Sequence, residues 1–112
     1  MSYHKEQFAR QIRRDISEFL ENNIPRPNGS FISVTNVALD DRAICADIFV
    51  SIFPDADSAK LFKELRFYEK EARTFLAPRL QRRLIPEIKF HLDDSQSSRI
   101  GLEKLLENIK NE

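Results

Sequence analysis

The fold is decided by residues 58–95, which read SAKLFKELRFYEKEARTFLAPRLQRRLIPEIKFHLDDS. At about 100° per residue, five apolar side chains of this stretch fall within one sector of about 80° on a helical wheel. They are Leu61, Leu65, Tyr68, Ala72 and Phe75. This spacing predicts a long helical region that buries one face. Pro78 lacks the amide hydrogen that a continuous helix needs, so we expect an interruption near it, and then one short strand.

Positive charge gathers on the opposite side of the same helical region, where Phe62 and Phe67 flank it. Lys63, Arg66, Lys70 and Arg73 recur at i, i+3, i+7 and i+10. Residues 60–89 hold nine Lys or Arg against four Glu, although the whole chain balances at 18 against 18. An ordinary solvated face is the alternative interpretation of such a stripe. A basic surface on a neutral chain favours instead an anionic partner.

The rest of the chain predicts a helix before this stretch, a hairpin, and a helix after it. Apolar periodicity indicates a first helix over residues 5–23, and β-branched and aromatic residues indicate strands over 31–39 and 43–53. The short polar link between these strands predicts an antiparallel hairpin. Alternation places Ile44, Ala46, Ile48, Val50 and Ile52 on one face of the second strand. A short strand at 88–92 and a last amphipathic helix at about 98–110 follow.

Eight apolar residues from these elements are expected to form one contiguous core. They are Ile12, Ile16, Leu20, Ile48, Val50, Leu65, Leu80 and Phe90.

Length and composition predict one folded domain over residues 1–112, with residues 98–112 as its carboxyl-terminal helix. The chain is 41% hydrophobic and 32% charged, which is typical of a globular protein. No apolar run approaches the roughly 20 residues that cross a bilayer, and the first residues lack the apolar core of a secretory signal. Cys45 is the only cysteine, which fits a reducing compartment. We therefore expect a cytoplasmic protein with no membrane partner.

Candidate catalytic residues are few. His91 and the pair Asp93–Asp94 lie at a strand end, where surface and capping roles are commoner than ligation or acid–base work. Cys45 has apolar neighbours and no expected base, which favours a packed thiol over a nucleophile. Two glycines leave no glycine-rich phosphate loop. The sequence thus predicts a protein that is not an enzyme and uses no cofactor and no metal.

The expected order is helix, strand, strand, interrupted helix pair, strand and terminal helix. Helices on one face of a three-stranded sheet would bury all the apolar stripes, and this α+β order matches the type II KH arrangement of RNA-binding domains. In the same order, five segments resemble the bacterial ribosome-binding factor A family: IRRDISEFLENNI (12–24), FISVTNV (31–37), AICADIFVSI (43–52), PEIKFHLDDS (86–95) and RIGLEKLLENI (99–109).

The resemblance implies a non-catalytic factor that assists maturation of the small ribosomal subunit. Its partners would be that subunit and its ribosomal RNA, near the decoding region, and the free protein would be a monomer. The dense cationic group is the expected RNA-binding site: Lys63, Arg66, Lys70, Arg73, Arg79, Arg82, Arg83 and Lys89. The alternative is a KH-like protein–protein interaction domain that has lost RNA binding, which the zero net charge favours.

One departure from the family pattern concerns the bend of the helix pair. The family bends this pair at an Ala-x-Gly element, whereas the aligned positions here are Tyr68, Glu69 and Lys70. These residues form helices well and include no glycine. The sequence therefore leaves two alternatives: the bend lies at Tyr68–Lys70 without glycine, or it has moved to Ala77–Pro78.

Overall fold

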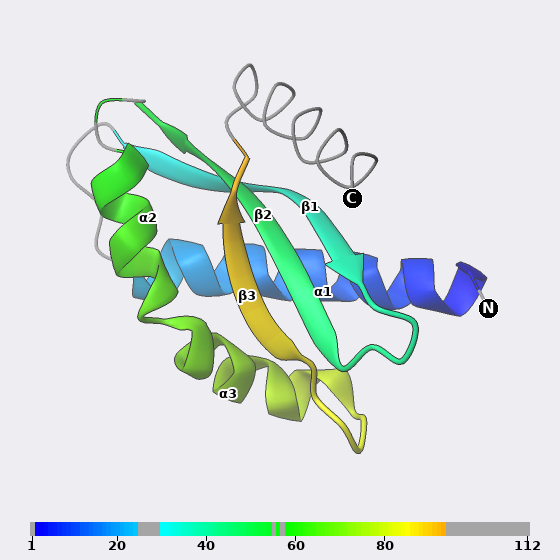
Figure 1. Ribbon diagram of the computed structural model, residues 1–112. Coiled ribbons are helices and arrows are strands. Elements are labelled where there is room, and N and C mark those ends of the chain that lie inside the picture. The colour runs from blue at the N-terminus through cyan, green and yellow to red at the C-terminus, as the bar shows by residue number, and fades with distance from the viewer. Residues whose placement is uncertain (1, 25–29, 55, 57, 94–112) are drawn as a thin grey trace, which may run out of the picture.

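Three helices pack on one face of a three-stranded sheet in the computed structural model, which describes residues 2–24, 30–54, 56 and 58–93 (Figure 1). The elements in chain order are α1 (Ser2–Asn23), β1 (Phe31–Leu39), β2 (Cys45–Phe53), α2 (Ser58–Arg66), α3 (Glu69–Leu80) and β3 (Glu87–Leu92). This order confirms the expected α+β arrangement. The expected terminal helix lies outside the described residues.

The sheet has the order β1-β2-β3, with β1 antiparallel and β3 parallel to the central β2. Alternate residues of all three strands are buried beneath the helices, and Ile48 and Val50 at the centre are fully buried. All eight residues expected in the core, Ile48 and Val50 among them, are buried in a single hydrophobic cluster. The predicted core is therefore confirmed.

Ile44 was expected on the buried face of the second strand, but β2 begins one residue after it. Asp40 accepts hydrogen bonds from the backbone N–H groups of Ile44 and Cys45, at 2.7 and 2.9 Å. These bonds hold the link between β1 and β2 as a turn through Ile44. The Ile44 side chain is consequently 52% exposed.

A bulge at Thr35 shifts the pairing of β1 with β2. Val34 pairs with Val50, but the next pair along the ladder is Asn36 with Phe49. The extra residue reverses the alternation of β1. Val37 therefore joins Val34 on the helix-covered side and packs against the core.

The bend of the helix pair lies at Phe67 and Tyr68, near the position that the family pattern indicated and not at Pro78. The N–H groups of Phe67 and Tyr68 donate to the carbonyls of Glu64 and Leu65, at 3.0 and 2.9 Å. These i to i−3 bonds tighten the last turn of α2 into a 3₁₀ turn. Tyr68 has φ −96° and ψ 6°, a conformation open to any residue, so the bend needs no glycine.

Pro78 lies inside the last turn of α3. Its missing N–H removes one hydrogen bond to the Thr74 carbonyl. The helix ends two residues later, at Leu80, and the following residue, Gln81, is left-handed at φ 50°. The bend at Phe67 rephases the helix, so that Ala72, Leu76 and Leu80 are the buried residues of α3. Arg79 is thereby left exposed.

Glu69 fastens the beginning of α3 to the edge of the sheet. Its Oε2 accepts the backbone N–H of Phe90 at 2.7 Å. β3 is an edge strand, so this N–H would otherwise have no strand partner. Arg66 lies 3.8 Å from the same carboxylate and joins the end of α2 to the contact. The bend is thus held by a long-range hydrogen bond to β3.

Candidate functional site

Seven of the eight predicted cations lie on the outer surface of α2, α3 and the loop that follows. Lys63 and Arg66 come from α2, Lys70, Arg73 and Arg79 from α3, and Arg82 and Arg83 from the loop; all are exposed. The helices must bury their apolar stripes against the sheet, so their charged residues remain outside. Within the described residues, the side chains of Lys63, Lys70 and Arg83 make no ion pair or hydrogen bond. We call these seven residues the basic surface.

The basic surface is not the single stripe that the i, i+3, i+7, i+10 spacing predicts. That spacing assumes one continuous helix, whereas the bend separates Arg66 from Lys70. Arg73 bonds to Ile85 in the loop before β3, whereas the Arg79 side chain stacks on Phe75, whose ring packs against α1. The cations are therefore spread across the width of the helix pair.

Arg73 holds the loop between α3 and β3. Its Nε and Nη2 donate to the carbonyl of Ile85 at 3.1 and 2.9 Å. A guanidinium carries five N–H donors, so part of the group still faces solvent. Arg73 consequently positions the loop that carries Arg82 and Arg83 and adds its own charge to the surface.

Arg79 is held against aromatic and polar residues at the boundary between α3 and α1. Its guanidinium carbon lies 3.7 Å from the centre of the Phe75 ring, and Nη1 donates to the Phe75 carbonyl at 2.9 Å. The Phe75 ring in turn packs against Phe19 of α1, at 5.3 Å. Gln11 of α1 donates to the Arg79 carbonyl at 3.0 Å. Stacking on a ring restrains a guanidinium while its N–H edges stay available to a ligand.

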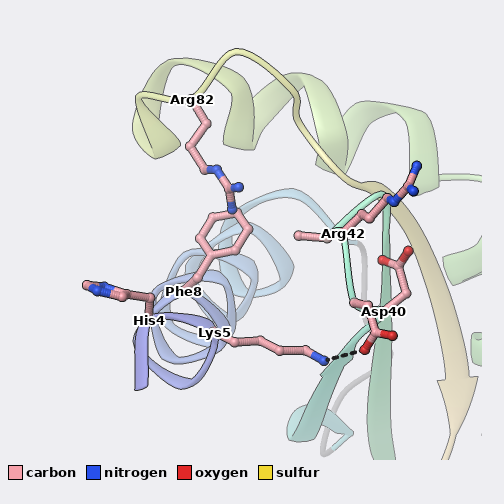
Figure 2. Close-up of a pocket in the computed structure, with 8 residues that line it drawn as sticks. His4, Lys5, Phe8, Asp40, Arg42 and Arg82 are labelled. Atoms are coloured by element: carbon pink, nitrogen blue, oxygen red, sulfur yellow. Dashed lines mark ion pairs between the residues drawn. The ribbon is translucent and has the colours of Figure 1, made fainter. Parts of the chain in front are cut away.

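Arg82 contacts the amino-terminal half of α1, and the two together line a hollow of about 280 Å³. Figure 2 shows its side chain descending onto Phe8, and the guanidinium carbon lies 4.1 Å from the centre of that ring. The wall opposite comes from the turn between β1 and β2: Asp40, Asp41, Arg42 and Ala43. The hollow thus joins the basic surface to the amino-terminal part of α1.

The acids of this hollow are already engaged. Asp41 lies 3.7 Å from Lys5, the ion pair drawn in Figure 2. The backbone N–H of Cys45, and with it that of Ile44, lowers the pKa of Asp40. Asp40 therefore stays ionised to lower pH than a free aspartate. Its carboxylate accepts the two backbone hydrogen bonds that hold the turn. Within the described residues, neither acid forms an ion pair with Arg82.

Lys89 lies apart from the other seven. It alternates along β3 with the buried Ile88 and Phe90, so its side chain leaves the sheet on the face opposite the helices. Among the described residues no helix covers this face, which we call the open face, and Asp47 and Asp93 make it acidic. His91 bonds to Asp47 at 2.7 Å and stacks on Phe49, and Asp93 accepts the Thr35 hydroxyl. The structure therefore does not bring Lys89 into the basic surface.

Cys45, the one cysteine of the chain, lies half-buried at the beginning of β2. Burial, followed by the nearby Asp47 carboxylate, raises the pKa of the Cys45 thiol. Across the described part of the chain, no three His, Cys, Asp or Glu residues come together in a way that could hold a metal ion. None of the helices described there is long and apolar enough to span a membrane.

Two residues of α1 that support the basic surface were missed from the sequence. Phe8 carries Arg82 and Gln11 holds the end of α3, yet both are about 70 residues from their partners. Of these contacts, only the stacking of Arg79 on Phe75 could be predicted from the sequence, because residues four apart along a helix lie side by side.

Element order and strand order define the class: an α+β domain of type II KH-like architecture, whose helices carry the basic surface. A model of the family "Ribosome-binding factor A" matches residues 4–106, and the chain belongs to this family. Ribosome-binding factor A of Clostridium botulinum (strain Eklund 17B / Type B) is 30% identical, over 97% of each chain. The protein of Macrococcus caseolyticus is 26% identical over 97% of this chain and 96% of its own.

Solved structures of the family have the same fold. The crystal structure of ribosome-binding factor A from Thermus thermophilus superposes with a TM-score of 0.69 at 19% identity, covering 79% of this chain and 94% of that one. A homology model of the Thermus thermophilus protein, fitted into the cryo-EM map of a 30S–RbfA complex, gives 0.62 at 21% identity, covering 74% and 88%.

Proposed function

We propose that this protein binds the small ribosomal subunit through its ribosomal RNA and assists maturation of that subunit without catalysing a reaction. Family membership supports the ribosomal partner, as does the 30S complex of the Thermus relative. In this proposal the chain acts in the cytoplasm, as one domain and as a monomer when free.

The observation that carries the proposal is the uneven charge of the molecule. Residues 60–89 hold nine Lys or Arg against four Glu, whereas the rest of the chain holds nine against fourteen Asp or Glu. The basic surface lies on the helices, and the open face of the sheet is acidic. An RNA partner is attracted to one side and repelled from the other, which orients the protein before contact.

The interface we propose consists of the seven residues of the basic surface. Arg79 and Arg82 are restrained members of it, because each guanidinium rests on a phenylalanine ring. A guanidinium already held in place loses less rotamer entropy when it binds a phosphate. Lys89 lies outside this interface because it projects from the acidic face.

Co-sedimentation with small ribosomal subunits across a salt series tests the proposal. The variant R79Q/R82Q/R83Q is compared with R10Q/R13Q/R14Q, which removes equal charge from the exposed side of α1. Each phosphate contact contributes about 0.7 to the slope of log affinity against log salt, so the first variant should flatten the slope by about two units. The second should leave it nearly unchanged, and immature subunits should bind more tightly than mature ones.

Three results would contradict the proposal. If the two triple variants weaken binding of the subunit equally, only the overall electrostatic field of the protein matters, and the proposed interface is misplaced. Binding that ignores salt in every variant would point to a protein partner. Equal binding of immature and mature subunits would remove the role in maturation.

A further inference from the structure

Phe67 is the one phenylalanine in this chain whose ring has no partner in the described residues. The chain has nine phenylalanines. Phe8, Phe19, Phe62, Phe75 and Phe90 belong to the core or pack against it, Phe49 stacks on His91, and Phe31 pairs with Phe53 at 5.7 Å. Phe67 is 76% exposed, more than any other large apolar residue of the described chain.

The bend determines that this ring points outward. The N–H of Phe67 bonds to the Glu64 carbonyl, which fixes the backbone in the tightened turn. Leu65 and Ala72 set the inward faces of the two helices, and the partly buried Tyr68 takes the inward position at the bend. Phe67 therefore lies at the apex between α2 and α3, on restrained backbone.

The charges beside Phe67 distinguish it from the other exposed rings. Lys63 precedes it by one helical turn and Lys70 follows it, and both are exposed with no ion pair in the described residues. Glu69, the acid nearest to it in the sequence, is turned inward to the Phe90 N–H. The Phe31–Phe53 pair, by contrast, lies on the acidic open face.

An exposed aromatic ring between two free lysines matches one chemical class of ligand, a flat apolar group flanked by anions. An unpaired nucleobase with its adjoining phosphates has this form. A ring on restrained backbone stacks at a small entropic cost, and base–aromatic stacking is worth about 5- to 150-fold in affinity per base.

We propose that Phe67 stacks on an unpaired base of ribosomal RNA, with Lys63 and Lys70 at the neighbouring phosphates. This inference rests on the proposed function and adds a base contact to a surface otherwise made of charge. It requires single-stranded or bulged RNA at the apex of the bend, because the bases of a duplex are already stacked on each other.

The absence of tryptophan from the sequence allows a direct test. F67W places a single tryptophan at the bend, and F53W places one on the open face as the control. Each variant is titrated with protein-free small-subunit ribosomal RNA, and binding is measured separately by filter retention. Stacking should quench the tryptophan emission of F67W in step with binding and leave the emission of F53W unchanged.

A second variant separates stacking from charge. F67A should weaken binding of the same RNA by on the order of tenfold and leave the salt slope unchanged, because no ionic contact is lost. Its circular dichroism should match that of the wild type, since the ring contributes little to the core.

The outcomes separate this inference from the proposed function. If RNA binds while the emission of F67W stays constant, or if F67A binds as the wild type does, then Phe67 is not a stacking residue and the basic surface still stands. Quenching of F53W would place the RNA on the sheet and overturn both proposals. Failure of the wild-type protein to bind the RNA would overturn the proposed function itself.

Discussion

Glu69 offers the sharpest test of how the glycine-free bend is held. Phe90 is 2% exposed, and its N–H on the free edge of β3 bonds to the Glu69 carboxylate at 2.7 Å. Glu69→Ala would leave this buried donor without a partner, at a cost of about 1–3 kcal/mol in the free energy of unfolding. Urea unfolding should therefore shift to a midpoint lower by about 1 M.

A matched control lies in the same helical turn. Glu71→Ala removes an exposed acid from the first turn of α3, and with it the interaction with the helix dipole that Glu69→Ala also removes. It should lower the free energy of unfolding by less than about 1 kcal/mol. Glu69→Gln keeps an oxygen acceptor and should fall between the wild type and the alanine variant. Amide hydrogen exchange gives a direct readout, because the Phe90 N–H should lose protection only when the acceptor is removed. Equal midpoints for the alanine variants at 69 and 71, or a Phe90 amide that stays protected, would refute this account of the bend.

Two further predictions concern β2. Ile48→Ala in the fully buried centre should lower the free energy of unfolding by about 2–5 kcal/mol, while the same change at the exposed Ile44 should stay within about 0.5 kcal/mol; similar urea midpoints would mean that the strand faces are inverted. The raised pKa of Cys45 keeps its thiol protonated to higher pH than in the unfolded chain, so the pH midpoint of its alkylation by iodoacetamide should be higher in buffer than in urea. Identical pH profiles in the two solvents would show that the folded surroundings do not disfavour the thiolate.

Much of the fold could be predicted because its signals are local. Apolar spacing in the helices and alternation in the strands identified the eight expected core residues, from Ile12 to Phe90, and all eight are buried. Ile44 was placed wrongly because alternation continues past the point where pairing stops. The Asp40 turn that ends the pairing depends on backbone geometry, which alternation does not encode.

The candidate site was less predictable, because several of its contacts are long-range. A helical wheel assumes one axis, so it could not show that the bend separates Arg66 from Lys70. The stack of Arg82 on Phe8 and the bond from Glu69 to Phe90 join distant residues. Helix propensity favours a break at Pro78, whereas the bend lies at Phe67, next to the Glu69 carboxylate of α3 that accepts the Phe90 N–H.

The bulge at Thr35 also determines which side chains the edge strand β1 exposes. β1 is an edge strand, and edge strands with exposed apolar residues are templates for aggregation. If β1 ran on in regular alternation through Thr35, Val37 and Leu39 would project from the open face, on the same side as Phe31. The bulge turns both towards the core and leaves Asn36 and Ala38 outside. One extra residue thus keeps Val37 and Leu39 from joining Phe31 in an exposed apolar ribbon along β1.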